Sequence, residues 1–552
     1  MKRATPLSLR VHRAPIVLCA ALALAGCGKT TTTKTTTLDV GAGPGTGPLP
    51  DGATGPRADA AAVPNCTASG PEICDGLDND CNGKIDEGYA LRCNACPAPG
   101  SCIEAQVTGG AWVEGIVRNL IVGNDRGIAL PSLPKRNPYI YVSNSAEDTV
   151  SKIRIADAVE VARIRTGNNP SRTAVDGNGD AWVAMRDNLV GTPEGDWDNV
   201  IKISGACIPK TKPPTPTREC ILLDIPRVGN TLRGVAVDAR GDVWIGSYGT
   251  QEVVLLDGAT GLVKTRVKLP EGSKPYGIAM DENGYLWVAS RDGEFHVIRV
   301  DPVTLKADIQ LDSKKLDYAS PYGIAADGKG GIWFGTFGTE IFRVDANTGA
   351  HGPSYKVGSS TRGVAVDDAG YIWAADSSLD MALRVDPKDG AVQKFKVGNG
   401  PVGVAADHDG NIWTVDESGN SATKLKPDGT LITTVKVGDG PYTYSDMAGS
   451  AFRIFKKLRG IFTATYGTGV KGAKWKSATL KGELAPTTKV TLRYRASDGD
   501  PKQATWQDAT LTGLTAALSA TGERIEVEVT LESSDRTAAP SYVENIQLRF
   551  ER

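Results

Sequence analysis

The residues of this sequence best suited to bind a metal ion lie between Glu72 and Gly88. Side-chain oxygens occur at alternate positions, a glycine follows the third of them, and an apolar residue and an acid come next, which is the spacing of a calcium-binding loop. Alternate side chains in a tight turn converge on one ion, and glycine permits the chain to reverse. The candidate ligands are Asp78, Asp80, Asn82, Asp86 and Glu87, together with the backbone carbonyl of Lys84.

The last position of this loop is Tyr89, where a bidentate acid is usual. We therefore expect a modest calcium affinity, with Kd on the order of 10⁻⁴ to 10⁻³ M. An acidic turn held by disulfides, without metal, is the alternative. The segment EICDGLDNDCNGKIDEG also resembles the metal-binding motif of bacterial surface proteins of the MopE type, which include a copper protein. No histidine lies between Cys66 and Cys102, and hard oxygen ligands favour calcium over copper.

Ten cysteines occur in the chain; if Cys19 leaves with an export signal and Cys27 is lipidated, eight remain for disulfides. An even number in an oxidising compartment predicts disulfides. Six cysteines within 37 residues indicate a small stapled module whose pairing the sequence leaves open, and two more flank a proline-rich segment and are expected to close a surface loop. The module cysteines are Cys66, Cys74, Cys81, Cys93, Cys96 and Cys102, and the loop cysteines are Cys207 and Cys220.

The N-terminus has the features of an export signal. Basic residues precede an apolar run over 14–24 that is too short to cross a bilayer. The run ends in Leu24-Ala25-Gly26-Cys27, which resembles the lipobox of bacterial lipoproteins and implies acylation of Cys27. Gly28 after the cysteine implies, by the same resemblance, an outer-membrane protein of the cell envelope. An ordinary secreted protein is the alternative.

Composition indicates a linker and limits the partners that we expect for the protein. Residues 28–64 are mostly Thr, Gly, Ala and Pro, which is typical of a disordered tether. The formal net charge is −2, which argues against nucleic acid as a partner. No later segment is long and apolar enough to span a bilayer, so we expect contact with the membrane through the lipid anchor alone.

A repeated pattern makes up most of the remaining chain. Each unit has a short apolar strand, an Asp-x-x-Gly turn, a strand centred on Trp and further strands, which predicts a four-stranded blade. Four copies align without gaps: PYGIAMDENGYLWVAS (275–290), PYGIAADGKGGIWFGT (321–336), TRGVAVDDAGYIWAAD (361–376) and PVGVAADHDGNIWTVD (401–416). Two more, at 232–247 and 170–185, match with small changes.

The spacing of these units predicts a β-propeller, because a period near 40 residues is typical of that fold. A strand at 139–145 lacks an inner partner, whereas 441–447 matches an inner strand without a Trp strand after it. Together they complete one blade, so we predict seven blades and a ring closed by the end of the chain. The six recurring tryptophans are expected to pack between blades.

The blade motif resembles the virginiamycin B lyase-like, NHL and YVTN group of seven-bladed propellers. In the lyase family the metal-dependent site includes histidines near the start of inner strands. Here the position before the glycine holds other residues, and His296, His351 and His408 lie elsewhere, with surface positions expected. The resemblance therefore favours a binding protein, with no catalytic residue assigned. A lyase or hydrolase with a divergent active site is the alternative.

The residues at the pre-glycine position are expected to gather at one mouth of the central channel. They are Arg233, Tyr276, Tyr322, Arg362 and, from the closing strand, Tyr442. Arginine and tyrosine together suit an anionic or glycan ligand, and a protein partner at the same face is also consistent. The alternative is that the tyrosines fill the channel and the arginines pair with Asp376 or Asp416.

The C-terminal region has alternating apolar and polar stretches, which predict a β-sandwich that loosely resembles jelly-roll modules. Trp475 and Trp506 are candidates for its core or for sugar stacking, and segment 111–122 is a candidate extra strand. The predicted fold is all-β. Its parts are a lipoprotein signal at 1–27, a linker at 28–64, a cysteine-rich module at 65–104, a connection at 105–137, the propeller at 138–449 and the sandwich at 450–552.

Overall fold

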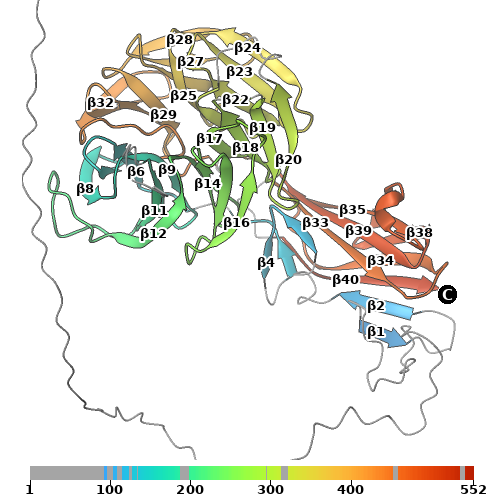
Figure 1. Ribbon diagram of the computed structural model, residues 1–552. Coiled ribbons are helices and arrows are strands. Elements are labelled where there is room, and N and C mark those ends of the chain that lie inside the picture. The colour runs from blue at the N-terminus through green and yellow to red at the C-terminus, as the bar shows by residue number, and fades with distance from the viewer. Residues whose placement is uncertain are drawn as a thin grey trace, which may run out of the picture. The chain divides into compact units, whose positions relative to one another are not determined.

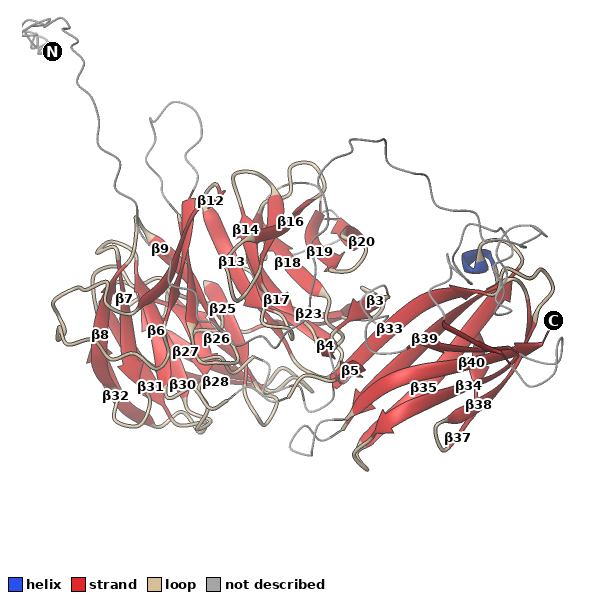
Figure 2. Ribbon diagram, turned by 90° about the horizontal axis from the view of Figure 1, so that it is seen from below, coloured by secondary structure: helices blue, strands red, loops and turns tan. Residues whose placement is uncertain are grey.

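The computed structural model describes residues 92–95, 103–107, 115–123, 127–132, 135–186, 198–291, 293, 295–312, 321–451, 455, 458–534 and 541–551. Within these ranges nearly all regular structure is β-strand, as predicted, and the one short helix is the 3-10 turn η3 (Pro501–Gln503) (Figure 2). No helix among the described residues is long and apolar enough to span a membrane.

Six four-stranded antiparallel sheets correspond to the six Trp-centred repeats, which confirms the predicted blade (Figure 1). The first three consist of β9 (Pro170–Val175), β10 (Ala181–Met185), β11 (Asp198–Ile203) and β12 (Ile221–Gly229); β13 (Leu232–Val237), β14 (Val243–Ser247), β15 (Glu252–Leu256) and β16 (Val263–Lys268); and β17 (Pro275–Met280), β18 (Leu286–Ser290), β19 (Phe295–Asp301) and β20 (Lys306–Asp312). The other three consist of β21 (Ile324–Ala326), β22 (Gly331–Gly335), β23 (Glu340–Asp345) and β24 (His351–Lys356); β25 (Thr361–Val366), β26 (Ile372–Asp376), β27 (Met381–Val385) and β28 (Val392–Lys396); and β29 (Pro401–Ala406), β30 (Ile412–Asp416), β31 (Ser421–Leu425) and β32 (Leu431–Lys436).

A further sheet contains β6 (Tyr139–Asn144), β7 (Thr149–Arg154) and β8 (Val159–Arg165). The end of the repeat region pairs with its inner edge: Asn144 bridges Pro441, and the Tyr442 amide donates to the Ser143 carbonyl over 2.7 Å. The chain therefore returns from its sixth repeat to the strands that precede its first. The blades lie side by side around a centre, which is the arrangement of a β-propeller (Figure 1).

Five of the six Trp-centred blades are organised around the aspartate six residues before the tryptophan. In the blade of Asp367, one carboxylate oxygen accepts the backbone N–H groups of Ala369 and Tyr371, at 3.0 and 2.9 Å, and the other accepts the Trp373 indole N–H at 2.9 Å. The carboxylate thus fixes both the turn and the indole of the following strand. The same indole-to-carboxylate bond joins Trp182 to Asp176, Trp287 to Asp281, Trp333 to Asp327 and Trp413 to Asp407.

The blade of Trp244 departs from this pattern. Its aspartate, Asp238, instead binds the Arg240 side chain at 3.2 Å, and within the described ranges the buried Trp244 indole nitrogen has no hydrogen-bond partner. All six tryptophans are nevertheless at most 1% exposed. Trp244 packs with Ile278 and Met280 of the next blade, and Trp373 packs with Val404 of the next, which confirms the predicted role in blade packing.

Two further antiparallel sheets lie outside the repeats. One contains β1 (Arg92–Ala95), β2 (Ile103–Val107), β4 (Ile121–Gly123), β5 (Gly127–Ala129), β34 (Lys474–Glu483), β37 (Leu511–Thr512), β38 (Thr515–Thr521) and β40 (Tyr542–Glu551). The other contains β3 (Ile116–Arg118), β33 (Leu458–Gly467), β35 (Thr488–Ser497), β36 (Gln507–Ala509) and β39 (Arg524–Ser533). Apolar side chains of both, such as Leu548 and Val527, belong to one buried cluster.

The segment before the repeats contributes strands to both sheets. β3, which lies within the expected segment 111–122, pairs with β33, and β5, which lies beyond that segment, pairs with β40. Trp475 is a core residue, 1% exposed, and its indole donates to the Gly522 carbonyl at 2.9 Å. Trp506 is partly buried and is covered by two guanidinium groups, those of Arg493 and Arg495, at 4.6 and 4.4 Å from its ring.

Candidate anion-binding site

Three of the predicted mouth residues meet at the centre of the blades. The hydroxyl of Tyr276 lies 2.9 Å from that of Tyr322 and 3.0 Å from that of Tyr442, and the Tyr322 and Tyr442 hydroxyls also hydrogen-bond to each other. All three side chains are buried. The tyrosines therefore fill this part of the channel, as one of the two sequence-based interpretations expected.

Glycine after four of the five mouth residues explains why these side chains gather; the exception is Tyr442, which is followed by Thr443. A Cβ at Gly277 would lie 2.8 Å from the Tyr322 carbonyl oxygen, and one at Gly363 would lie 2.9 Å from that of Val402. Each contact joins the inner strand of one blade to the start of the next, so only glycine permits this approach. The close approach brings the preceding residues of successive blades into contact.

Arg172 occupies a position that is glycine in the other Trp-centred repeats. Five repeats have glycine four positions before the turn aspartate, whereas the repeat with Asp176 has arginine there. This side chain is 1% exposed. Its guanidinium carbon lies 3.1 Å from the ring centre of Tyr444, 5.1 Å from that of Tyr276 and 5.4 Å from that of Tyr442. Arg172 is thus enclosed by the tyrosines.

Other arginines surround the same rings. Arg186 lies 4.2 Å from the ring centre of Tyr442, Arg233 lies 5.0 Å from that of Tyr276, and Arg291 lies 5.4 Å from that of Tyr276. These three side chains are only partly buried. We call the whole set the arginine–tyrosine layer: Arg172, Arg186, Arg233, Arg291, Tyr276, Tyr322, Tyr442 and Tyr444.

Arg362, the fifth predicted residue, lies at the edge of this layer. Its guanidinium carbon is 4.7 Å from the Phe337 ring, which packs 5.1 Å from Tyr322, and one nitrogen pairs with Glu417 at 3.2 Å. Asp376 and Asp416, the acids expected to neutralise arginines, instead accept backbone or hydroxyl hydrogen bonds from their own blades. The carboxylate that pairs with Arg362 is therefore not one of the predicted pair.

Several donors in the layer and at its edge have no hydrogen-bond partner among the described residues. The unpaired buried atoms are Nε and Nη2 of Arg172, Nε and Nη1 of Arg233, Nε of Arg362 and the hydroxyl of Tyr444. Such groups are uncommon in protein interiors, because an unsatisfied buried polar group costs about 1–3 kcal/mol. The layer is thus cationic and rich in free donors, which suits it to bind an anion.

The electrostatics of the layer favour negative charge. Burial lowers the pKa of Arg172 to about 10, so the side chain stays cationic at neutral pH. For Tyr276, burial opposes ionisation, but the charges of Arg172 and Arg233 and hydrogen bonds from two tyrosines outweigh it and lower its pKa to about 8. Burial raises the pKa of Tyr442. Burial also raises the pKa of Tyr322, so the arginine charges favour a negative charge at Tyr276 but not at Tyr322 or Tyr442.

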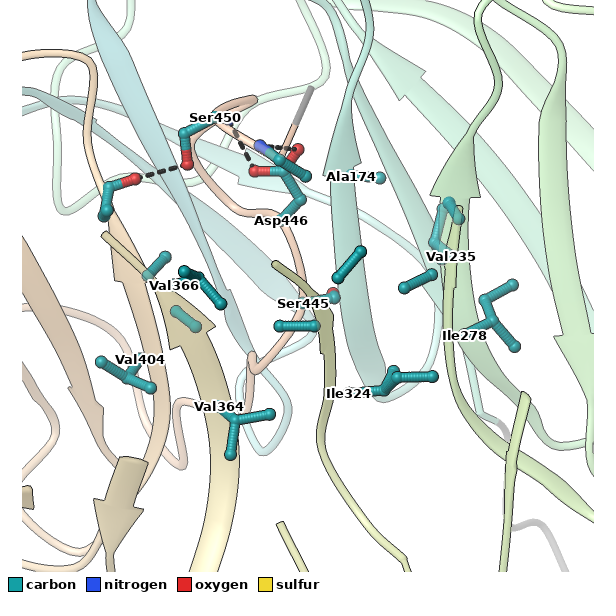
Figure 3. A pocket seen from close by; sticks show the side chains of 18 of the residues that line it. Ala174, Val235, Ile278, Ile324, Val364, Val366, Val404, Ser445, Asp446 and Ser450 are labelled. Atoms are coloured by element: carbon teal, nitrogen blue, oxygen red, sulfur yellow. Dashed lines mark hydrogen bonds between the residues drawn. The ribbon is translucent and has the colours of Figure 1, made fainter. Parts of the chain in front are cut away.

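Beyond the layer, the next residues of the inner strands enclose a cavity of about 90 Å³ (Figure 3). Small apolar side chains such as Ala174, Val235 and Ile278 line it. Its one carboxyl, that of Asp446, accepts the backbone N–H groups of Ser450 and Ala451 at 2.8 and 3.2 Å. Burial raises the pKa of Asp446 to about 6. The cavity offers little to bind an anion.

The three histidines of the repeat region differ in burial. His408 was expected at the surface, and this is wrong: it is 4% exposed, with one ring nitrogen 2.9 Å from the Ala448 carbonyl oxygen and the other accepting the Asn137 amide. His351 is exposed and His296 is partly buried. In the part of the chain that the structure describes, no three His, Cys, Asp or Glu side chains are placed to hold a metal ion.

Other sequence predictions lie outside the described residues. These are the calcium ligands between Asp78 and Glu87, the lipidated Cys27 and the side chains of the six module cysteines. The remaining pair, Cys207 and Cys220, forms the predicted disulfide.

Comparisons with known proteins bear on the fold. The model of the virginiamycin B lyase family matches residues 224–441. Virginiamycin B lyase from Staphylococcus aureus is 15% identical over 55% of this chain and 95% of its own, with a TM-score of 0.35. A protein from Lactobacillus plantarum is 13% identical over 55% and 98%, with a TM-score of 0.44. No curated protein matches the sequence.

The family match supports the predicted likeness of the repeats to propellers of the virginiamycin B lyase-like group. It does not by itself assign an activity, because one fold carries many functions. The function has to be argued from the residues of the site.

Proposed function

We propose that this protein is an envelope-anchored lipoprotein whose propeller, closed as seven blades, binds an anionic ligand such as an acidic glycan at the arginine–tyrosine layer. The observation that carries this proposal is the set of buried guanidinium nitrogens without partners on Arg172, Arg233 and Arg362. Ligand oxygens would satisfy these donors, and the tyrosine rings would contact the apolar faces of the ligand.

The test measures binding of the full chain to polygalacturonate, dextran sulfate, polyphosphate and neutral dextran by biolayer interferometry. Arg233→Ala with Arg362→Ala should weaken binding to the preferred polyanion by at least about tenfold, because both side chains have unpaired donors in or beside the layer. Arg154→Ala with Arg218→Ala is the matched control, since both arginines are exposed and form ion pairs elsewhere. The proposal would be refuted if the site variant bound polyanions as tightly as the control variant, or if the wild type bound none of them.

A second candidate function is that of a lyase or hydrolase, favoured by the family match over 224–441. Lyase chemistry of that family uses a divalent metal with histidine, whereas the layer supplies arginine and tyrosine. The two functions differ in one observable property. Turnover of virginiamycin B or quinupristin that depends on a divalent ion would favour the enzyme.

The proposed lipid anchor and calcium module rest on sequence. Cys27 ends a lipobox-like motif, and the acids between Asp78 and Glu87 have the spacing of a calcium loop. A calcium-stabilised module would keep the long tether and the propeller joined by a compact, protease-resistant segment.

Millimolar calcium should raise the melting temperature of the module's transition in calorimetry of the full chain, because an ion that binds only the folded state stabilises it by mass action. Asp78→Ala with Asp80→Ala should abolish the rise. Asp368→Ala with Asp409→Ala, which removes two acids outside the loop, should preserve it. The same rise in both double variants would show that calcium acts elsewhere.

A further inference from the structure

Arg172 has a buried bidentate edge that is unpaired. Its Nη1 donates to the Ser171 hydroxyl at 2.9 Å, whereas Nε and Nη2 have no hydrogen-bond partner among the residues that the structure describes. The N–H groups of Nε and Nη2 point in parallel from one edge of the guanidinium plane, which is the geometry that grips two oxygens of an oxyanion. The plane itself is fixed, because it stacks on the Tyr444 ring at 3.1 Å.

No carboxylate of the described residues is close enough to pair with this edge. The groups that act most strongly on the charge of Arg172 are three tyrosines and the cation of Arg233. Glu417, the acid beside the layer, already pairs with Arg362. Burial of an unpaired ion costs several kcal/mol. An anion that binds from solvent and pairs with Arg172 would offset a large share of this desolvation cost.

The charge around this edge exceeds that of one arginine. Arg233 also has two unpaired nitrogens, and both its guanidinium carbon and that of Arg172 lie about 5 Å from the Tyr276 ring centre. Arg186 lies beside Tyr442 and Arg291 beside Tyr276, and both arginines are only partly buried, so they add positive charge at the partly exposed side of the layer. Several cations around one point attract a doubly charged group more strongly than a singly charged one.

We propose that Arg172 and Arg233 bind a tetrahedral dianion, the phosphoryl group of a phosphate monoester or free phosphate, with two of its oxygens on Nε and Nη2 of Arg172. This rests on the proposed function and names the chemical group that the layer selects. The remaining oxygens accept from the free nitrogens of Arg233. The tyrosine rings enclose whatever is attached to the phosphoryl group.

The experiment is calorimetric titration of the full chain with inorganic phosphate at pH 7, in a buffer free of other oxyanions. Arg172→Lys should weaken binding at least about tenfold, because lysine keeps the charge but lacks the bidentate edge. Arg384→Lys is the matched control: Arg384 also stacks on a tyrosine, Tyr371, at 3.5 Å and also has a buried unpaired Nε, but lies on β27 outside the layer. Equal losses in both variants would overturn the assignment.

Two further ligands refine the assignment. Glucose 6-phosphate distinguishes a phosphorylated molecule from free phosphate, and acetate tests the preference for a dianion. Glucose 6-phosphate should bind at least as tightly as phosphate if the layer recognises a phosphorylated molecule, and more weakly if it holds free phosphate alone. Acetate, a planar monoanion, should bind at least about tenfold more weakly than phosphate. Acetate binding as tight as that of phosphate would overturn the choice of a dianion.

A measurement on the wild type alone covers the case in which Arg172→Lys fails to fold. Phosphate should shift the ultraviolet titration of Tyr276 to higher pH, because a bound anion opposes formation of the Tyr276 phenolate. No shift and no heat of binding, with polyanion binding intact, would refute the phosphoryl site but leave the proposed function standing. Loss of polyanion binding as well would refute both.

Discussion

Replacement of Asp367 by alanine is expected to lower the free energy of unfolding of the propeller by about 3 kcal/mol. The substitution removes the acceptor of three hydrogen bonds, from the Ala369 and Tyr371 amides and the Trp373 indole. It leaves a buried indole N–H without a partner, and an orphaned buried donor costs about 1–3 kcal/mol. Urea unfolding followed by tryptophan fluorescence measures the loss.

Two variants calibrate this result. Asp368→Ala changes the neighbouring exposed acid and should alter stability by less than about 0.5 kcal/mol. Asp238→Ala should cost about 1–2 kcal/mol less than Asp367→Ala, because the Trp244 indole already lacks a partner in the native protein. If Asp367→Ala were as stable as Asp368→Ala, the aspartate would not be what secures the blade.

The fold could be predicted from the sequence because its signal is repeated. The turn aspartate, the glycine of the turn and the buried tryptophan recur at fixed spacing, because each blade packs against its neighbours in the same way. The pairing of Pro441 with Asn144 could be predicted too, because two incomplete units complement each other. Position 89 and the other residues of the cysteine-rich segment have no such repetition to support them.

The site could be predicted only in part, because its most informative residue departs from the repeat. The position before the glycine predicts Tyr276, Tyr322 and Arg233 as site residues. It does not predict Arg172, which occupies the glycine position itself. A comparison of the repeats at that position would have revealed it. Tyr444 and Glu417 carried no signal, since their roles arise from contacts between blades distant in sequence.

The stability of the ligand-free protein depends on a competition at Arg172. Its contact with the Tyr444 ring contributes up to about 2 kcal/mol in a desolvated setting, and its bond to Ser171 about 1 kcal/mol. Against these stands the desolvation of a cation with two unpaired nitrogens, which costs several kcal/mol. We expect the desolvation to prevail, so that the site is maintained at the expense of stability.

Arg172→Met should therefore raise the free energy of unfolding by about 1–3 kcal/mol in a buffer without phosphate or sulfate, because methionine retains much of the volume and removes the buried charge. The same variant should lose the stabilisation that phosphate gives the wild type, so that the order of the two melting temperatures reverses as phosphate is added. Arg384→Met serves as the control and should leave the phosphate response unchanged. A variant less stable than the wild type in both buffers would show that Arg172 supports the tyrosines by packing, and the open edge would then need no ligand to explain it.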